Sequence, residues 1–545
     1  MKTEDGVETG HEILNGGQIV DEAARKWSDR AVLYHYESGR AITYKEIASM
    51  SNRVGNGLRS SGVEIENRVA ILMDDCPEWV YIFFGTLKIG AVAIPFNTLL
   101  TEQDYAFFLN DSRAKILFVG DSHFEKIKAI IPSLPYLKRV VVCDGNDVKG
   151  EGDRLVTWGD FIKDASGVLE IEPTLSSDIA LFVYTSGSTG RPRAIIHSHT
   201  HCALSATYNR EVEGLGEGDI QFNIPKLYFL VSIGGLFSTF DNGSSVVLLS
   251  GRPTPMTILE LIARHKPTIL RGPPTIFARM VEAIKEAPHL SDLGSVRYIF
   301  CSGEALSPEL FRRFKETFGI ILYNNWGAQE TGSAPISWRH GEEVPLEKVG
   351  SMGKSPIPGA KVKIVDEHER EVPDGVSGEL MVQTRTQFLG YWHEPINTAL
   401  KMSKAWYKPG DSFIRDKEGY YWYLGRQDDM LKIAGRQIFP VEVEHEVSRH
   451  PAVLENAVIP VNNEYGLPEL HAYVVLKEGY PPSPELATQI QSFVKEGLAP
   501  YKRPQRIVFV PELPKTATGK IQRFVLKDQA SEAKIEMGGK DQQGS

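Results

Sequence analysis

Cysteine is scarce in this sequence, and the few cysteines are isolated from one another. The four thiols belong to Cys76, Cys143, Cys202 and Cys301, and no Cys-x-x-Cys pair occurs among them. Zinc sites and redox dithiols use such pairs, and small disulfide scaffolds carry far denser cysteine. The sequence therefore argues against a disulfide framework and against cysteine-bound zinc, and it indicates reduced thiols in a cytoplasmic protein.

Long apolar runs and an excess of positive charge are missing too. No stretch approaches the roughly 18 apolar residues that a membrane-spanning helix needs, and Met1–Gly6 lacks the apolar core of a secretory signal. The formal net charge is −10, which disfavours binding to the phosphates of nucleic acids or anionic lipids. We expect no nucleic-acid partner and no membrane insertion. The oligomeric state stays open, with a homo-oligomer as one option.

The first part of the chain alternates between strand-like and helix-like segments. Arg68–Met73 is typical of a buried strand, and Pro77–Ile89 is typical of a helix with an apolar face. A chain of 545 residues is also too long for a single core. The alternation predicts an α/β fold in which a large N-terminal domain holds two parallel-type sheets with helices on their faces.

The character of the sequence changes twice towards the C-terminus. Short strands and turns, including a hairpin over Phe413–Leu424, indicate a small β-rich subdomain. From Arg426 onward the order helix, strand, strand, helix, strand predicts a small α/β domain of its own. We expect an N-terminal domain over residues 1–427, a mobile C-terminal domain over 428–528, and a polar, disordered tail over 529–545.

A loop rich in glycine and hydroxyl groups, Tyr184–Ala194, follows the apolar run Ile179–Val183. Glycine permits tight turns and close approach to a ligand, and backbone N–H groups with Ser and Thr hydroxyls favour an anion. Arg191 and Arg193 add positive charge suited to phosphate oxygens. A plain surface turn needs neither a preceding strand nor an arginine pair. The loop therefore predicts a phosphate site, although it lacks the spacing of a Walker A motif.

Two further strand-like runs, ending at Cys301 and Tyr323, also lead into loops that contain glycine. Ligands of open α/β sheets bind where strands end at their carboxyl edge. The three loops therefore predict one shared cleft.

These segments resemble motifs of the adenylate-forming superfamily, which comprises acyl- and aryl-CoA ligases, luciferases and peptide-synthetase adenylation domains. Tyr184–Ala194 resembles its phosphate loop, T-S-G-S/T-T-G-x-P-K-G, with Arg193 at the lysine position and Ala194 at the final glycine. Gly425–Gly435 resembles its hinge motif, and Pro514–Arg523 resembles the segment with its catalytic lysine. Within the superfamily the sequence is most similar to benzoate-CoA ligases and related aryl-CoA ligases.

The resemblance implies a site for ATP or AMP and a catalytic group. Lys520 matches the catalytic lysine, Arg193 assists at the phosphates, and Glu330 binds Mg²⁺ as well as being catalytic. Asp411 accepts the ribose hydroxyls, and Gln329 replaces the usual threonine of the Y-G-x-T-E motif. The implied nucleotide-binding residues are Thr185, Ser186, Gly187, Ser188, Thr189, Gly190, Gly303, Glu304, Ala305, Trp326, Gln329, Asp411 and Arg426.

The resemblance also implies a hinge, a coenzyme A channel and an acyl pocket. Asp428 is the hinge, and the implied channel residues are Lys432, Gly435 and Arg436. The implied acyl-pocket residues are Tyr228, Phe229, Leu230, Val231, Trp326, Gly327 and Ala328. None of them is charged, and Trp326 is large enough to limit acyl length. The pocket is therefore expected to take an uncharged ring or short chain and to reject a dicarboxylate.

Together these features predict an ATP- and Mg²⁺-dependent carboxylate–CoA ligase that forms an acyl-adenylate. Its substrate is a small carboxylic acid, either aromatic and benzoate-like, or compact and cyclic, or short and aliphatic. Two alternatives stay open. One is an adenylation enzyme that loads a carrier protein, and the other is a non-catalytic nucleotide-binding protein, for which the replacements Arg193 and Gln329 are the only support.

Overall fold

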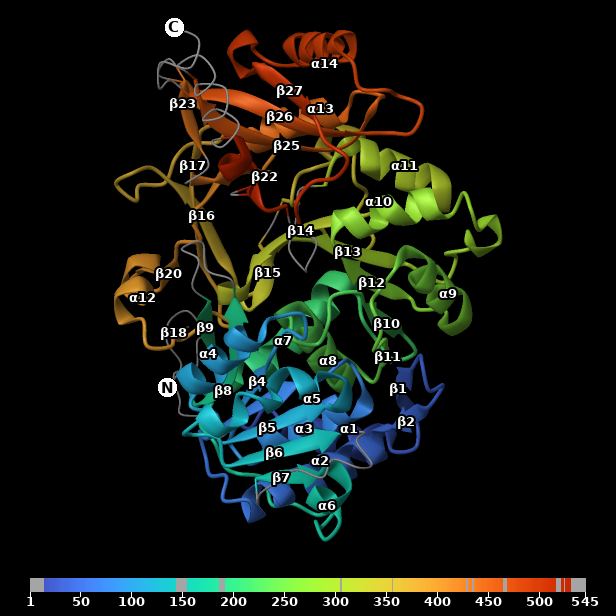
Figure 1. Ribbon diagram of the computed structural model, residues 1–545, viewed down its shortest axis with the longest axis vertical. Coiled ribbons are helices and arrows are strands. Elements are labelled where there is room, and N and C mark those ends of the chain that lie inside the picture. Colours follow the sequence, from blue (N-terminus) through green and yellow to red (C-terminus); the bar gives the residue numbers. More distant parts are fainter. Residues whose placement is uncertain are drawn as a thin grey trace, which may run out of the picture.

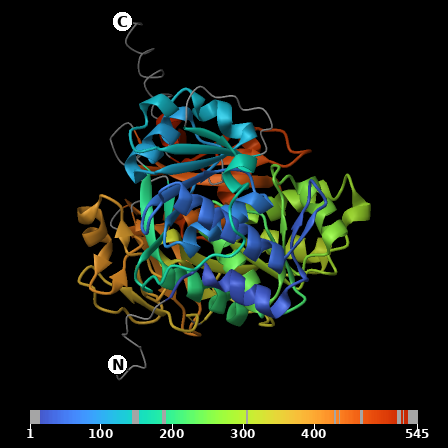
Figure 2. The same cartoon turned by 90° about the horizontal axis from the view of Figure 1, so that it is seen from below.

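The computed structural model describes residues 14–143, 154–185, 192–303, 306–354, 356–427, 430–433, 436–463, 468–515, 521–523 and 525–530, with only the backbone for 432–433 and 436–437. Two large sheets form the lower body of the molecule, and a smaller lobe sits above them (Figure 1). The β-rich part and the helices α9–α11 lie on opposite flanks, which is clear from below (Figure 2).

One sheet runs in the order β18-β9-β8-β4-β3-β5-β6-β7. Its middle strands pair in parallel, whereas β9 pairs antiparallel with both β8 and β18. Strands such as β5 are buried along their whole length, because helices cover both faces. The bounds are β3 Arg68–Leu72, β4 Val92–Pro95, β5 Ile116–Gly120, β6 Arg139–Cys143, β7 Leu155–Thr157, β8 Ile179–Thr185, β9 Arg193–Ser198 and β18 Gly390–Tyr391.

The second sheet runs in the order β15-β14-β13-β12-β10-β11-β1-β2. Its central strands are parallel, and the edge strands β2 and β15 are antiparallel to their neighbours. The bounds are β1 Ala31–His35, β2 Ala41–Thr43, β10 Ile220–Asn223, β11 Ser245–Leu248, β12 Ile269–Gly272, β13 Tyr298–Ser302, β14 Tyr323–Ala328 and β15 Ser333–Ser337. The predicted pair of parallel-type sheets is confirmed, with antiparallel strands added at their edges.

The predicted β-rich subdomain is also present as a sheet in the order β19-β20-β17-β21-β22, with β16 paired to β17. The expected hairpin is formed by β21 and β22. The bounds are β16 Lys361–Val365, β17 Ser377–Gln383, β19 Met402–Ser403, β20 Trp406–Tyr407, β21 Asp411–Arg415 and β22 Tyr421–Arg426.

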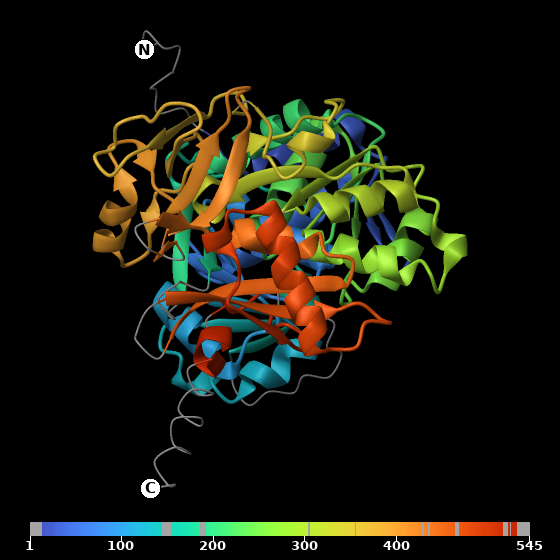
Figure 3. The same cartoon turned by 90° about the horizontal axis from the view of Figure 1, so that it is seen from above.

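The C-terminal lobe contains the sheet β25-β26-β27 and the hairpin β23–β24. Helices α13 and α14 pack on this sheet through a core that includes Val443, Val474 and Ile490. Figure 3 shows the lobe from above, lying over the middle of the N-terminal sheets. The strand bounds are β23 Leu431–Ile433, β24 Arg436–Ile438, β25 Val453–Asn462, β26 Pro468–Leu476 and β27 Arg506–Phe509. A domain boundary at residue 428 stays a prediction, since residues 428–429 lie outside the described ranges.

The helices begin with the signals that the sequence supplies. In α4, Thr101 accepts the N–H of Asp104 while Asp104 accepts the N–H of Thr101, which forms a capping box. In the described parts of the chain, no helix has both the length and the apolar character to cross a bilayer. The helix bounds are α1 Gln18–Trp27, α2 Tyr44–Ser60, α3 Pro77–Lys88, α4 Glu102–Ser112, α5 Asp121–Lys128, α6 Trp158–Ile162, α7 His199–Glu213, α8 Leu230–Asn242, α9 Pro255–His265, α10 Pro274–Ala283, α11 Pro308–Phe318, α12 Pro395–Lys401, α13 Pro440–Ser448 and α14 Pro484–Gly497.

One strand boundary differs from the sequence expectation. The expected strand ends at Tyr323, but β14 begins at Tyr323 and continues to Ala328. Asn325 pairs with Ser337 on one side, and with Ser302 on the other. Two neighbouring strands therefore hold a segment whose asparagines and glycine are typical of a loop. This difference decides where Trp326 points.

Candidate active site

A large cavity lies between the carboxyl ends of the N-terminal strands and the underside of the C-terminal lobe. Its volume is about 2070 Å³, which exceeds the roughly 300–1,000 Å³ of a pocket for one small ligand. The cavity therefore has room for a nucleotide together with a second substrate. The sequence-predicted residues that line it are Thr185, Arg193, Tyr228, Phe229, Leu230, Val231, Gly303, Gly327, Ala328, Gln329, Glu330, Asp411 and Arg426.

The predicted phosphate loop is closed at its base by the hairpin β8–β9, in which Thr185 pairs with Arg193. The Arg193 Nε atom lies 3.0 Å from Glu394 Oε2, and its guanidinium lies 5.8 Å from the centre of the Tyr391 ring. These contacts hold the guanidinium at the cavity wall, where Glu394 balances part of its charge, and a guanidinium is suited to phosphate oxygens. Residues 186–190 of the predicted loop lie outside the described ranges.

Glu330, the predicted metal ligand, belongs to a short helical turn, Gln329–Thr331, directly after β14. The Tyr391 hydroxyl donates a 2.7 Å hydrogen bond to Glu330 Oε1, and the Phe388 N–H donates to the Glu330 carbonyl at 2.8 Å. Burial, followed by the charge of Glu330, raises the pKa of Tyr391, so the phenol stays a donor. Sequence reasoning missed Tyr391. The signal was its short apolar segment, Phe388–Trp392, which pairs with β9.

The arrangement of the acidic side chains shows which donors Mg²⁺ would find in this site. Among the described residues, no group of three or more His, Cys, Asp or Glu side chains is placed to hold a metal ion. Mg²⁺ is usually bound by one or two carboxylates together with substrate phosphates. The carboxylate of Glu330 at the cavity wall fits that donor set, in which the nucleotide would supply the remaining oxygens.

Asp411, the predicted ribose ligand, lies at the start of β21 with 4% of its surface exposed. The Trp326 Nε1–H donates to Asp411 Oδ2 at 2.8 Å, and Arg426 Nη1 lies 3.1 Å from Oδ1. Burial raises the pKa of Asp411, while the charge of Arg426 opposes that change. Arg426 is held at the cavity mouth by its bond to the Pro409 carbonyl, at 2.9 Å.

Trp326 does not line the cavity, which corrects its expected place in the acyl pocket. Because β14 continues past Tyr323, side chains alternate along it, and the indole faces the β-rich subdomain. There it packs among Ile336, Met352 and Leu380 with 6% of its surface exposed. The expectation that Trp326 limits acyl length therefore has no support in the cavity lining.

The apolar part of the cavity is formed where β10 leads into α8. The rings of Tyr228 and Phe229 lie 4.7 Å apart, followed by Leu230 and Val231 in the first turn of α8. The loop before them is fixed at two points. The Lys226 ammonium donates to the Gly251 carbonyl at 2.7 Å, and Asp75 Oδ1 accepts the Leu227 N–H at 3.0 Å.

A charged residue that sequence reasoning missed, Arg271, also lines the cavity. It lies in β12, next to the strand's last residue, with 1% of its surface exposed. It forms a two-pronged ion pair with Glu213 of α7. Gln221 and Asn223 accept two more of its N–H groups, at 2.6 and 2.8 Å. The pocket wall therefore contains charge, but Glu213 balances it. An arginine directly after the apolar run Thr268–Leu270 was the available signal.

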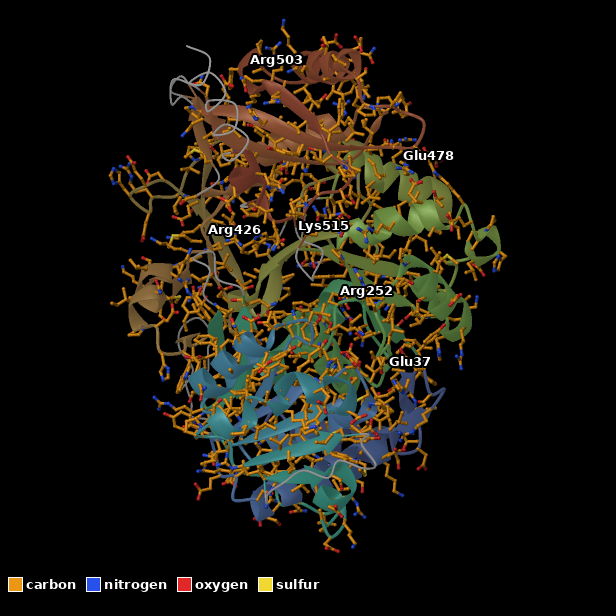
Figure 4. The ribbon with its side chains drawn as sticks, in the orientation of Figure 1. Glu37, Arg252, Arg426, Glu478, Arg503 and Lys515 are labelled. Atoms are coloured by element: carbon orange, nitrogen blue, oxygen red, sulfur yellow. The ribbon has the colours of Figure 1, made fainter. Side chains whose placement is uncertain are left out.

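The C-terminal lobe contributes a wall to the same cavity. Lys515, Gln522 and Arg523 line it, and Lys515 also pairs with Glu455 at 2.6 Å. Figure 4 places Lys515 and Arg426 at the level where the lobe meets the N-terminal sheets. The Gln522 N–H donates to the Pro514 carbonyl at 2.8 Å, which joins the two described segments on either side of residues 516–520.

Several predicted site residues cannot be placed. Glu304, Ala305, Asp428, Gly435 and Lys520 lie outside the described residues. Lys432 and Arg436 lie on the paired strands β23 and β24, where only the backbone is described. Their roles stay predictions.

Known proteins match this chain along almost its whole length. The model of the AMP-binding enzyme family matches residues 20–392, and that of the AMP-binding enzyme C-terminal domain matches residues 442–520. A benzoate–CoA ligase from Thauera aromatica is 37% identical over 90% of this chain and 92% of its own. An acetyl-coenzyme A synthetase from Bacillus subtilis is 33% identical over 94% of this chain and 89% of its own.

Solved structures show the same similarity. An anthranilate CoA ligase in complex with anthranoyl-AMP superposes with a TM-score of 0.88 at 35% identity, covering 96% of this chain and 98% of that one. A benzoate CoA ligase from Burkholderia xenovorans superposes with a TM-score of 0.84 at 31% identity, covering 94% and 99%. On the matched residues and the shared fold, this chain belongs to the AMP-binding enzyme family.

Proposed function

We propose that this protein is an ATP-dependent carboxylate–CoA ligase that acts on an aromatic acid through an acyl-adenylate. The observation that carries the proposal is the single cavity, which joins the phosphate hairpin, Asp411 and the apolar pocket around Phe229. A ligase that adenylates an acid needs these three elements within one enclosure, since the carboxylate must meet the α-phosphate of ATP.

In the first step, an oxygen of the acid attacks the α-phosphorus, the bond to the bridging oxygen of the β-phosphate breaks, and pyrophosphate leaves. Positioning and charge neutralisation supply most of the catalysis in such displacements. Arg193 provides a fixed charge at the phosphates, and Lys520 provides a second one from the C-terminal lobe. Mg²⁺ bound by Glu330 and the phosphates would neutralise charge on the departing pyrophosphate.

In the second step, the coenzyme A thiol loses its proton, its sulfur attacks the acyl carbon, and AMP leaves. This step needs the thiol to reach the place where Lys520 acted. We assign the replacement of Lys520 by the thiol channel to a rotation of the C-terminal domain, residues 428–528, about Asp428. Lys432, Gly435 and Arg436 then border the channel for the pantetheine arm.

The choice of an aromatic acid rests on the pocket and on the relatives. Tyr228, Phe229, Leu230 and Val231 line the cavity, and their side chains are mostly apolar. Apolar burial favours a flat ring by about 25 cal/mol per Å². Relatives named as ligases of benzoate and anthranilate align along most of this chain. An uncharged benzoate-like acid is therefore the proposed substrate, with compact cyclic or short aliphatic acids as weaker ones.

Two measurements test the proposal together. The first is acid-dependent exchange of pyrophosphate into ATP. The second is formation of CoA esters from benzoate, hydroxybenzoates, aminobenzoates, cyclohexanecarboxylate and short fatty acids. We expect exchange and CoA esters with aromatic acids. Exchange without CoA esters would point to an enzyme that loads a carrier protein. The absence of exchange with every acid would contradict adenylation itself.

A further inference from the structure

The contact between Trp326 and Asp411 joins two parts of the fold that are far apart in the sequence. Trp326 lies in β14 of the second large sheet, and Asp411 opens β21 of the β-rich subdomain. The indole N–H donates to Asp411 Oδ2 at 2.8 Å, across 85 residues of sequence. Both side chains are almost fully buried, so water offers little competition for the bond.

The two oxygens of Asp411 have different surroundings. Oδ2 is held by the indole. Oδ1 lies 3.1 Å from Arg426 Nη1, but within the described residues no donor is aligned to form a hydrogen bond with it. Because Asp411 lines the cavity, Oδ1 is the acceptor left for a ligand. A buried acceptor without a donor is costly, and a ligand hydroxyl would satisfy it.

The indole is itself firmly held, so it can fix the rotation of the carboxylate. The Trp326 ring meets Phe413 edge-to-face, with centroids 5.6 Å apart and an interplanar angle of 84°. Ile336 and Leu380 belong to the same buried cluster. A rigid donor on one oxygen fixes the orientation of the carboxylate and therefore of the other oxygen.

We propose that Trp326 is a positioning residue for nucleotide recognition: its indole N–H orients Asp411 so that the carboxylate accepts the 2′- and 3′-hydroxyls of a ribose. This inference rests on the proposed nucleotide site. It assigns Trp326 to discrimination between ribose and deoxyribose nucleotides and removes it from the choice of acid.

The test compares ATP with 2′-deoxy-ATP and 3′-deoxy-ATP in wild-type protein and in Trp326→Phe. Phenylalanine keeps an aromatic ring in the cluster but removes the N–H donor and part of the indole's volume, and the control variant below loses the same volume. Hydrogen bonds to charged groups contribute enough that their loss corresponds to about a 10- to 100-fold effect. We expect wild type to bind ATP more tightly than either deoxy analogue by calorimetry, and the variant to lose most of that preference. The rank order of acids in CoA-ester formation should not change.

Trp338→Phe is the matched control. Trp338 is also buried, at 4% exposure, and its indole donates to the Ser351 carbonyl at 3.0 Å, but it does not line the cavity. It should keep the wild-type preference for ATP. An unchanged preference in Trp326→Phe, or an altered rank order of acids, would overturn the inference. Failure of the wild-type protein to bind ATP would instead overturn the proposed function, which separates the two results.

Discussion

The phenol of Tyr391 donates a 2.7 Å hydrogen bond to Glu330, across 61 residues of sequence. The bond anchors one oxygen of the proposed Mg²⁺ ligand from a strand that also pairs with β9 beside Arg193. Through Tyr391, the strand β18 therefore fixes the position of Glu330 relative to the hairpin β8–β9. Neither segment fixes this relative position by itself.

Removing the hydroxyl group of Tyr391 should lower the affinity for Mg²⁺ without abolishing its binding. In Tyr391→Phe the ring stays and the donor is lost, so Glu330 is free to leave its position. A hydrogen bond to a charged group contributes about 1.5–3 kcal/mol. We therefore expect the Mg²⁺ concentration for half-maximal pyrophosphate exchange to rise about 10-fold or more. Binding of Mn²⁺ in the presence of ATP, followed by electron paramagnetic resonance, gives a readout that does not depend on turnover.

Tyr81→Phe is the control for this prediction, because its hydroxyl donates to Glu46 at 3.0 Å and neither residue lines the cavity. Its Mg²⁺ dependence should match that of wild type. Equal Mn²⁺ affinity in wild type and Tyr391→Phe would show that the phenol does not position the metal ligand.

Lys520 should act in only one of the two half-reactions. The segments on either side of it, at Lys515 and Gln522, line the cavity, and the hydrogen bond from Gln522 to Pro514 joins these two segments. Loss of a charge that stabilises a transition state costs about 100-fold or more. Lys520→Ala should therefore slow adenylation by that factor, while CoA-ester formation from a supplied acyl-adenylate survives. Equal losses in both half-reactions would contradict the rotation of the C-terminal domain.

Asp75 makes the stability of the acyl-pocket loop depend on pH. Burial raises the pKa of its carboxyl from 3.8 to about 6, and the charge of Lys226 opposes the change. A raised pKa in the folded state means that the contribution of Asp75 to stability is full below the unfolded pKa and is lost as pH rises through 6. In Asp75→Asn the amide oxygen can still accept the Leu227 N–H, but the side chain does not ionise. Above pH 6 the free energy of unfolding of wild type should therefore fall by about 3 kcal/mol relative to that of the variant.

Unfolding of wild type, Asp75→Asn and Asp74→Asn between about pH 2.5 and 7.5 checks this sign. The neighbouring Asp74 is the opposite case: burial acts to raise its pKa, but the interaction with His123, whose Nε2 lies 3.1 Å from Asp74 Oδ2, outweighs burial and lowers it. Asp74→Asn should therefore cost stability at neutral pH and progressively less as the pH falls below 4. A parallel pH dependence in both variants would refute the environments assigned to these two carboxyls.

Local sequence patterns predicted most helices and strands. The site residues that these patterns missed or misplaced depend on contacts between residues far apart in the sequence. The hairpin from Thr185 to Arg193 was predictable because apolar runs flank a glycine-rich loop. Trp326 was misplaced because its partner, Asp411, lies 85 residues away. The pairing of Arg271 with Glu213 spans 58 residues. Buried polar side chains depend on partners that only the folded chain brings together, and a motif alone does not name them.

Val231 offers the sharpest test of the acyl pocket. It lies in the first turn of α8, lines the cavity and packs beside Tyr208 and Phe300. Val231→Ala removes two methyl groups from the wall of the pocket. The kcat/KM for acids with a ring substituent should therefore rise relative to that for benzoate. Pocket-size discrimination of this kind is worth about 1–3 kcal/mol, which corresponds to a change of about 10-fold or more in the ratio of kcat/KM values.

Ile233→Val separates pocket shape from general loosening of α8. Ile233 is on the same helix but fully buried in the core, so its truncation should lower stability by about 1 kcal/mol and leave the order of acids unchanged. The measurement is kcat/KM across benzoate, its hydroxy and amino derivatives, and a dicarboxylate, for wild type and both variants. The Arg271–Glu213 pair is already balanced, so a dicarboxylate should remain a poor substrate in all three proteins. If Val231→Ala lowers kcat/KM for every acid by the same factor, Val231 supports the fold and the acyl group lies elsewhere in the cavity.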